Sequence, residues 1–336
     1  MGLIEKLQEI LTIKNNIKTS IESKNVTVGN KSFSEYPNLI KSIQSGGGSG
    51  GDELILDTAE FLFFQGARLS YLDKLLKGLV DGTCRYYRAF YQFSKSFTMP
   101  NPCEFKYTTT TFENSYYGKN FEYIDLDETF YYATGMTTLN IKDRGYPFYL
   151  RQSFYNCTKL KEITSTTGVL NVGSADRSFQ GCSILESIPK LIINGNPSLQ
   201  QTFRDCKKLK KVELEGRTTL GNFAGVSPTT IPLYYTFHTC SSLESVTGLD
   251  ITNFTSVSSP FYKCTNLKVL DFTGTENVQI NLDLSTTGLD AEGLMNMLET
   301  LPDISTSRTI TIGSEKMALL SEADIALFTS KGYTLA

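Results

Sequence analysis

Residues 153–163 read SFYNCTKLKEI, and close variants return as SFQGCSILESI at residues 178–188 and as TFHTCSSLESV at residues 236–246. The shared pattern is Phe-x2-Cys-x2-Leu-x2 followed by Ile, Leu or Val. It occurs five times, beginning at Phe154, Phe179, Phe203, Phe237 and Phe261, so that successive phenylalanines are 25, 24, 34 and 24 residues apart. A period of about 20 to 29 residues fits one coil of a solenoid. The chain is therefore predicted to stack repeated coils.

The apolar positions of the pattern predict which residues are buried. The leucine and the branched residue after it are expected in a short strand of a parallel sheet, while the phenylalanine and cysteine pack into the core on the return path. The predicted repeat core comprises Phe154, Cys157, Leu160, Phe179, Cys182, Leu185, Phe203, Cys206, Leu209, Phe237, Cys240, Leu243, Phe261, Cys264 and Leu267.

The array extends beyond the five clear copies. The same spacing, with substitutions, continues upstream in Phe130, Ala133, Met136 and Leu139 and again in Phe90, Phe93, Ser96 and Met99. The single 34-residue interval indicates an insertion of about ten residues around residues 218–232.

The motif copies resemble the BspA-type leucine-rich repeats of bacterial surface proteins and of many bacteriophage structural proteins. The resemblance covers roughly residues 60–336 and implies an α/β fold, a leucine-rich-repeat solenoid with a parallel β-sheet. Residues 66–79, GARLSYLDKLLKGL, resemble a short helix placed before such arrays. Residues 308–336 resemble the α/β C-terminal cap of phage-encoded members. A resemblance of this kind specifies architecture more closely than function.

The predicted cap occupies residues 290–336. A helix is expected over residues 290–301 with Asp290 as its N-cap, and a second helix from Ser321, where Ser321 and Asp324 form a capping-box-like pair. A solenoid needs such a lid because its last coil would otherwise expose its core.

The first residues predict a helical anchor. Apolar residues fall at a coiled-coil spacing, interrupted by Lys14, at Leu3, Leu7, Ile10, Ile17 and Ile21. Because so short a helix is marginal alone, we expect it to dock on copies of the chain, as a dimer or trimer, or on another protein. Packing on its own body is the alternative.

A glycine-rich stretch, GGGSGG at residues 46–51, predicts a linker after the anchor. The expected organisation is an anchor and oligomerisation segment at residues 1–44, a linker at 45–51, a solenoid at 52–289 and a cap at 290–336. The isoleucine-rich helix followed by a glycine linker also resembles the anchoring pieces of phage fibre proteins.

Composition argues against most enzyme classes. Lys and Arg number 32 against 35 for Asp and Glu, so the chain has no basic excess for nucleic acid. His238 is the only histidine, which removes histidine-ligated metal sites. No apolar run approaches the about 18 residues needed to span a bilayer, and no signal-peptide core is visible. We therefore expect no enzymatic activity, metal, cofactor or membrane insertion.

Several residues that carry reactive groups have simple structural explanations. The seven cysteines form no CxxC pair and predict a ladder of buried thiols instead of disulfides or a zinc site. His238 is predicted to be a surface or turn residue. Asp125 and Asp127 would share one face of a strand, which is compatible in principle with paired-carboxylate glycoside hydrolysis, but a solvated strand edge gives the same pattern.

One basic cluster stands out in the repeats. It flanks Leu209 and consists of Lys207, Lys208, Lys210 and Lys211. The alternation indicates a solvated turn, with binding of an acidic partner as the alternative.

Tyrosine pairs define a candidate adhesion face: Tyr86, Tyr87, Tyr116, Tyr117, Tyr131 and Tyr132. In a strand, one member of each pair must face outward. Exposed tyrosines among small polar residues suit glycan stacking or protein recognition. The pairs can instead be ladder residues on two faces of a sheet, and the absence of Trp weakens the glycan interpretation.

These features lead to the hypothesis of a non-enzymatic fibre or decoration protein of a bacteriophage virion. The N-terminal segment would attach it to another virion protein on the head or, less favoured, the tail. The solenoid would project toward host-surface glycans or proteins. Such a protein is made in the host cytoplasm and located on the particle surface. The alternatives are a bacterial cell-surface adhesin, which needs export and attachment signals, and a solenoid glycan-degrading enzyme.

Overall fold

The computed structural model describes Lys18, Phe90, Met99 and residues 101–105, 109–110, 122–194, 198–217, 232–252, 254 and 256–336. The chain divides into two compact units, Met1–Leu54 and Ile55–Ala336. The predicted anchor residues Leu3, Leu7, Ile10, Ile17 and Ile21 and the glycine linker lie outside the described residues. The fold below is that of the second unit.

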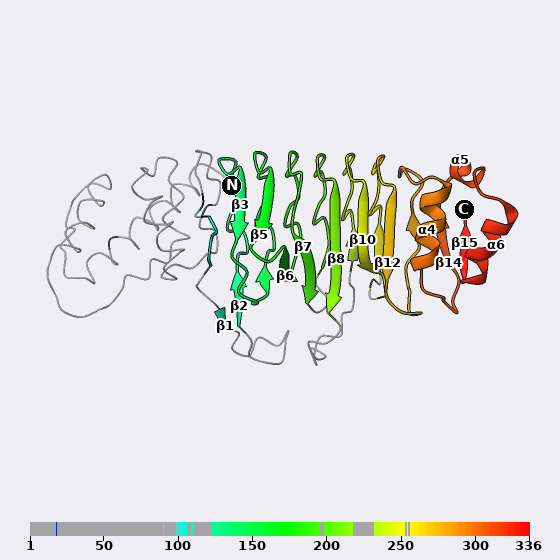
Figure 1. The fold of residues 1–336 in the computed structure, drawn as a ribbon, viewed down its shortest axis with the longest axis horizontal. Helices are drawn as coiled ribbons and strands as arrows, with labels where there is room; N and C mark the ends of the chain where they lie inside the picture. Colours follow the sequence, from blue (N-terminus) through cyan, green and yellow to red (C-terminus); the bar gives the residue numbers. More distant parts are fainter. Residues whose placement is uncertain are drawn as a thin grey trace. The chain divides into compact units, whose positions relative to one another are not determined.

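Parallel strands from successive coils form the main sheet (Figure 1). Its order is β1 (Thr109–Thr110), β2 (Glu122–Asp125), β4 (Phe148–Tyr149), β6 (Val169–Ser174), β7 (Lys190–Asn194), β8 (Lys211–Arg217), β10 (Ser245–Asp250) and β12 (Val269–Thr273). Its neighbours pair in parallel, except that β1 runs antiparallel to β2. Two further parallel pairs join β3 (Thr138–Ile141) to β5 (Glu162–Ser165), and β9 (Pro232–Tyr234) to β11 (Ser256–Ser258).

The register of these strands follows the repeat. The branched residue that closes one motif copy lies opposite its counterpart in the next coil, as Leu139 does with Ile163 and Val246 with Leu270. Equivalent side chains therefore stack into columns. This arrangement is a solenoid-like α/β fold with a parallel sheet of many strands.

The core is a column of aromatic rings flanked by columns of cysteine and leucine. All fifteen residues of the predicted repeat core are at most 1% exposed. Consecutive repeat phenylalanines from Phe90 to Phe261 stack with ring centroids 5.1–5.4 Å apart and interplanar angles of 6–12°. Phe90 and Met99 are buried with this core, whereas Phe93 and Ser96 lie outside the described residues. The array thus begins upstream of Phe154, as predicted.

Hydrogen bonds within the turns hold neighbouring coils together. The Ser or Thr before a repeat phenylalanine donates to a carbonyl of the preceding coil, as from Ser153 Oγ to Leu126 O at 2.6 Å. Each repeat cysteine donates its thiol hydrogen to the carbonyl of the preceding coil's phenylalanine at 2.9–3.0 Å. The same carbonyl also accepts an N–H from its own coil, so both lone pairs are used.

The described cysteines are free and buried, as the predicted thiol ladder requires. Burial raises the pKa of the Cys103 and Cys264 thiols to about 12. Buried thiols that stay protonated are unreactive, so these side chains serve packing and hydrogen bonding.

Each turn contains two residues with left-handed backbone. They lie two positions before and two positions after the repeat phenylalanine, and all have positive φ: Glu128, Tyr132, Gln152, Asn156, Arg177, Gly181, Gln201, Asp205, Tyr235, Thr239, Ser259 and Lys263. Most of these residues are not glycine, so the coil geometry imposes the conformation on side chains that disfavour it.

The last residues form a three-stranded parallel sheet and three helices. The sheet orders β13 (Leu282–Asp283), β14 (Arg308–Thr311) and β15 (Tyr333–Leu335). Helix α4 (Ala291–Thr300) packs on β12, and α5 (Ser314–Met317) and α6 (Glu322–Ser330) follow β14. Asp290 caps α4, and Ser321 with Asp324 forms the capping box of α6, so both helices begin where predicted.

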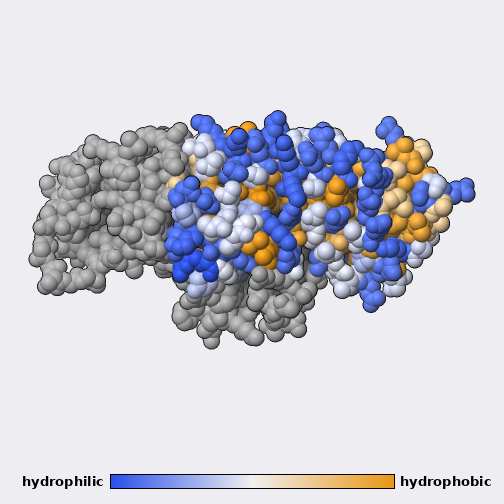
Figure 2. Space-filling model, viewed as in Figure 1, coloured by the Kyte–Doolittle hydropathy of each residue, from blue (hydrophilic) through white to orange (hydrophobic). Residues whose placement is uncertain are grey.

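The surface of these coils is mostly hydrophilic in the view of Figure 2, whereas apolar surface gathers at the C-terminal end. There Leu319 and Leu327 are 57% and 50% exposed. In the part of the chain that the structure describes, no helix is long and apolar enough to cross a membrane.

Candidate binding face

The turns around the repeat phenylalanines present a continuous row of polar and aromatic side chains. We call the outward-facing residues of segments 127–132, 151–156, 176–181, 200–205, 234–239 and 258–263 the turn face. In each segment the phenylalanine and the residue before it are buried, while the residues after the phenylalanine reach the surface. Backbone N–H groups donate to the next coil at every second residue, which fixes the positions of these side chains.

Three tyrosines from two adjacent coils form the first aromatic cluster: Tyr131, Tyr132 and Tyr155. The rings of Tyr131 and Tyr155 stack with centroids 4.9 Å apart, and Tyr132 lies 4.9 and 5.5 Å from them in tilted contacts. Tyr132 is 38% exposed. The cluster therefore offers aromatic surface and phenolic hydroxyls to a ligand.

A second aromatic cluster lies several coils farther along and consists of Tyr235, His238 and Tyr262. The His238 ring stacks on Tyr262 at 4.9 Å and meets Tyr235 edge-on at 5.4 Å. Two cations lie over its outer rings, the Arg204 guanidinium 5.5 Å from Tyr235 and the Lys263 ammonium 5.2 Å from Tyr262. This cluster combines aromatic surface with positive charge.

Each cluster contains a tyrosine with left-handed backbone, Tyr132 with φ of 55° and Tyr235 with φ of 52°. Bulky aromatic residues adopt this region at an energetic cost, and Asn or Asp is favoured there. Asn156 and Asp205 occupy the position of Tyr132 in other coils of the array. Tyrosine at a position better suited to asparagine points to a use for the exposed ring.

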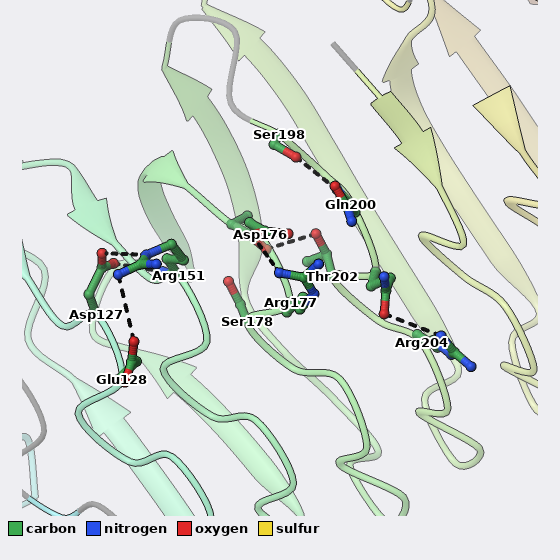
Figure 3. Close-up of polar contacts among 12 residues, drawn as sticks. Asp127, Glu128, Arg151, Asp176, Arg177, Ser178, Ser198, Gln200, Thr202 and Arg204 are labelled. Carbon is green, nitrogen blue, oxygen red and sulfur yellow. Dashed lines mark hydrogen bonds and ion pairs between the residues drawn. The ribbon is translucent and has the colours of Figure 1, made fainter. Parts of the chain in front are cut away.

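Charged side chains pair along the turn face (Figure 3). Arg151 bridges two coils, with its Nε 3.1 Å from Asp127 Oδ2 and its Nη2 3.6 Å from Glu128 Oε1. Arg177 Nη1 lies 3.3 Å from Asp176 Oδ2. Burial, reinforced by the nearby Asp125 carboxylate and opposed by Arg151, raises the pKa of Asp127 to about 6.

The middle of the turn face holds polar atoms that lack a hydrogen-bond partner. These buried atoms are Asp176 Oδ1, Gln180 Oε1 and Arg204 Nε, the last of which lies 3.5 Å from Asp205 Oδ2 in an ion pair. Buried polar atoms are normally hydrogen-bonded, so their position between the two aromatic clusters is suited to a ligand that supplies the missing bonds.

The structure corrects the interpretation of Asp125 and Asp127. Strand β2 ends at Asp125, so Asp127 lies in the following turn and the two carboxylates do not share a strand face. The Asp127 N–H donates to Asp125 Oδ1 at 3.0 Å, which closes an Asx turn. Both residues are half-buried, and Asp127 is paired with Arg151, so a solvated strand edge is wrong. The pair supports the turn.

The tyrosine pairs are also placed differently from the prediction. Tyr131 and Tyr132 lie in a turn, where the alternation of a strand does not apply and both rings reach the surface. Tyr86, Tyr87, Tyr116 and Tyr117 lie outside the described residues.

The lysine cluster and the histidine lie where expected. Lys207, Lys208, Lys210 and Lys211 are exposed around buried Leu209. His238 is in a turn, half-buried, and bonded through Nδ1 to Thr239 Oγ1 at 2.7 Å. Among the described residues, no group of three or more His, Cys, Asp and Glu is arranged to hold a metal ion.

The second aromatic cluster was not predicted, although a signal for it exists in the sequence. When the repeats are aligned on their phenylalanines, the next position holds Tyr131, Tyr155, Gln180, Arg204, His238 and Tyr262. Because equivalent residues of stacked coils are neighbours, adjacent aromatic residues in this column indicate ring contacts. Tyrosines that are adjacent in the sequence therefore do not indicate the ring contacts that form between coils.

Stacked parallel strands, buried columns of phenylalanine and leucine and a period of 24 or 25 residues between most coils define a leucine-rich-repeat solenoid. A family model describes the repeat more closely: residues 126–231 and 200–283 match the BspA type leucine rich repeat region, in six copies. Residues 126–283 therefore match BspA-type leucine-rich repeats, a family that is generally non-enzymatic, and the match suggests a repeat-based binding or adhesion protein. Comparisons with curated proteins and with solved structures found no match.

Proposed function

We propose that this protein is a non-enzymatic adhesive fibre or decoration protein of a bacteriophage virion. Residues 1–44 would attach it to another virion protein and join copies of the chain as a dimer or trimer. The repeat solenoid would present the turn face to glycans or proteins of the host surface. The protein would be made in the host cytoplasm and carried on the outside of the particle, on the head in preference to the tail.

The observation that carries the adhesive part of the proposal is the pair of aromatic clusters on stacked, hydrogen-bonded turns. Tyrosine supplies contact area at low entropic cost, and a rigid backbone lowers the cost further. Tyr132 and Tyr262 are 38% and 37% exposed although each contacts another ring. Several copies on one particle would turn weak contacts into strong attachment.

Binding to cells tests the adhesive function. Fluorescently labelled full-length chain is incubated with bacterial cells, and the amount retained is compared with that of a double variant, Tyr132→Ala with Tyr155→Ala. We expect the double variant to lose most of the binding. The matched control, Lys207→Ala with Lys208→Ala, changes two exposed residues outside the turn face and should bind like the unaltered chain. Equal binding by all three proteins contradicts an adhesive role of the turn face.

Assembly through the N-terminal segment is tested by light scattering after size exclusion. The full chain is expected to be a dimer or trimer, and a chain beginning at Asp52 is expected to be a monomer. If both are monomers, the self-associating part of the proposal is wrong.

Location on a virion is tested by immunogold electron microscopy with an antibody against the solenoid. Particles released by cells that carry the gene should be labelled on their surface. Labelling of the bacterial envelope without particle labelling would instead identify a cell-surface adhesin.

A further inference from the structure

The second aromatic cluster carries information about the ligand, and the following inference rests on the proposed adhesive function. We propose that Tyr235, His238 and Tyr262, with Arg204 and Lys263, form a subsite for a carboxylate-bearing sugar residue. The turn face then binds an acidic glycan, with a charged residue at this subsite and a further sugar residue on the first aromatic cluster.

The geometry of the subsite matches such a residue. A pyranose ring has an apolar C–H face that packs on aromatic rings, while its carboxylate needs a cation at the edge of the stack. Arg204 and Lys263 lie over the two outer rings, at 5.5 and 5.2 Å, so a cation stands at each end of the aromatic row. A guanidinium fork also suits a planar carboxylate in a two-bond arrangement.

The positive charge of the subsite comes from Arg204 and Lys263 and not from the histidine. Burial, and then the nearby Arg204, lower the pKa of His238, which leaves its ring neutral at neutral pH. Arg204 is partly balanced by Asp205, whose Oδ2 lies 3.5 Å from Nε, and it donates to Gln201 Oε1 at 3.2 Å. Nε is buried, but the bond to Gln201 uses only one N–H of the two terminal nitrogens, so the guanidinium retains donors for a ligand there.

The two clusters differ in charge. The first cluster consists of tyrosines, and the acidic residues of its coil, Asp127 and Glu128, are paired with Arg151. Nothing in that arrangement favours an anion. A polymer that carries carboxylates would therefore place a charged residue on the second cluster and use the first for stacking alone.

The separation of the clusters fits an extended ligand. Tyr155 and His238 are three coils apart, and the ring stacking between those coils repeats every 5.3–5.4 Å, which gives about 16 Å. Between them lies Gln180, whose Oε1 is buried and makes no hydrogen bond. Sugar hydroxyls would satisfy such groups along an oligosaccharide of several residues.

A polar polymer suits this surface better than a folded protein does. A specific protein interface usually buries about 1,200–2,000 Å² around a compact apolar centre. In the described part of the turn face, the aromatic residues form two separate clusters divided by glutamine, arginine and aspartate. A chain that alternates apolar faces and hydroxyl groups matches this alternation.

The test compares two polymers with the same backbone. Polygalacturonate carries a carboxylate on every residue, and its fully methyl-esterified form carries none. Binding of each to the full-length chain is measured by interferometry at low and moderate salt, together with alginate and hyaluronate as acidic polymers of different stereochemistry. We expect at least one acidic polymer to bind tenfold or more tightly than the ester, with affinity that falls as salt rises.

Variants locate the effect. Arg204→Gln and Lys263→Gln should each weaken binding of the acidic polymer at least fivefold and leave binding of the ester unchanged. Tyr155→Ala should weaken binding of both polymers, and the control Lys208→Gln should change neither. Circular dichroism of every variant is used to check that the fold is retained.

Three results overturn the inference. In the first, no acidic polymer binds more tightly than the ester. In the second, Arg204→Gln and Lys263→Gln bind the acidic polymer as tightly as the unaltered chain does. In the third, the chain no longer binds cells treated with protease but still binds cells oxidised with periodate. The last result identifies a protein ligand, which leaves the adhesive function in place and removes the acidic glycan. Loss of the adhesive function itself is detected separately by the tyrosine double variant on cells.

Discussion

Two surfaces of the same coils have opposite character. The residues that directly follow the stacked leucines from Leu160 to Leu289, here called the strand face, alternate in charge along the stack: Lys161, Glu186, Lys210, Glu244, Lys268 and Asp290. The backbone N–H of each residue from Glu186 to Lys268 donates to the carbonyl of its predecessor in this row, which keeps the row in register. Ion pairs of 3.7 Å between Lys161 and Glu186 and of 3.2 Å between Lys268 and Asp290 close its two ends.

The comparison shows that one repeat can place paired charges on one surface and exposed aromatic rings on another. On the strand face, each charge has an opposite charge one coil away. On the turn face, aromatic rings are exposed, two tyrosines have costly backbone, and buried polar atoms lack partners. A surface that keeps such features at a cost in stability is suited to a ligand.

Both faces depend on the phenylalanine column, so the largest effect is expected from breaking it. Phe203→Ala removes a fully buried ring that stacks on two neighbours at 5.4 Å. The loss of burial and the cavity left behind should lower the free energy of unfolding by about 3–5 kcal/mol. Denaturant unfolding followed by circular dichroism measures the change. A loss below about 1 kcal/mol would mean that the column is not the principal source of stability.

The two faces should also differ in the sign of their pH dependence. The pKa of Asp127 on the turn face is raised to about 6, so its carboxyl binds a proton more readily in the folded state. The free energy of unfolding should therefore fall as pH rises from about 4 to 6, by roughly 2 kcal/mol or less. Asp127→Asn should remove this dependence in pH-resolved unfolding experiments.

Asp290 on the strand face provides the contrast. The Gly293 N–H and Lys268 lower its pKa, so its contribution to stability is present at neutral pH and is lost as pH falls through the lowered pKa. Asp290→Asn should remove only the loss of the free energy of unfolding at acidic pH. If Asp127→Asn and Asp290→Asn change the pH dependence of the free energy of unfolding in the same pH range and direction, the environments assigned to the two carboxyl groups are wrong.

Replacing the left-handed tyrosine should separate stability from binding. Tyr132→Asn places a favoured residue at φ of 55°, as Asn156 does in the next coil, and should raise the free energy of unfolding by about 0.5–1 kcal/mol. The same change removes an exposed ring and should lower cell binding at least tenfold. Thermal unfolding and retention on cells give the two measurements. A variant that is less stable and binds normally would show that the ring serves packing.

The smallest effect is expected on the strand face. Lys161→Gln removes one partner of an exposed ion pair with a separation of 3.7 Å, in which both side chains are about half exposed. Such pairs are screened by water and salt, so the free energy of unfolding should change by less than about 0.5 kcal/mol and cell binding should not change. A loss of binding would show that the strand face contributes to recognition.

Much of the fold could be predicted because the repeat determines it. A motif with a period of 24 or 25 residues requires equivalent leucines and phenylalanines to stack, and the structure has them stacked from Phe90 onward. Asp290 and Ser321 predict the starts of their helices correctly, because capping depends on residues three positions apart. Local patterns of this kind do not depend on the rest of the chain.

The candidate site was predicted only in part. Tyr131 and Tyr132 were recognised as neighbours in sequence, whereas their contact with Tyr155, and the contact of His238 with Tyr262, run between coils. Asp125 and Asp127 were assigned to one strand because the end of β2 is not marked by a proline or glycine. The turn begins there because Asp125 accepts the Asp127 N–H, a competition between side chain and strand that pattern reading does not resolve.

By itself, the sequence determined the period, the buried columns and the parallel sheet, since these follow from repeated apolar residues that can be buried only by stacking. Only the tertiary structure decided which side chains from different coils come together. It placed tyrosines in left-handed turns, joined Arg204 and Lys263 to one aromatic cluster, and left polar atoms unpaired between the two clusters. The reason is physical: burial depends on each coil's own pattern, whereas a surface site depends on how neighbouring coils align.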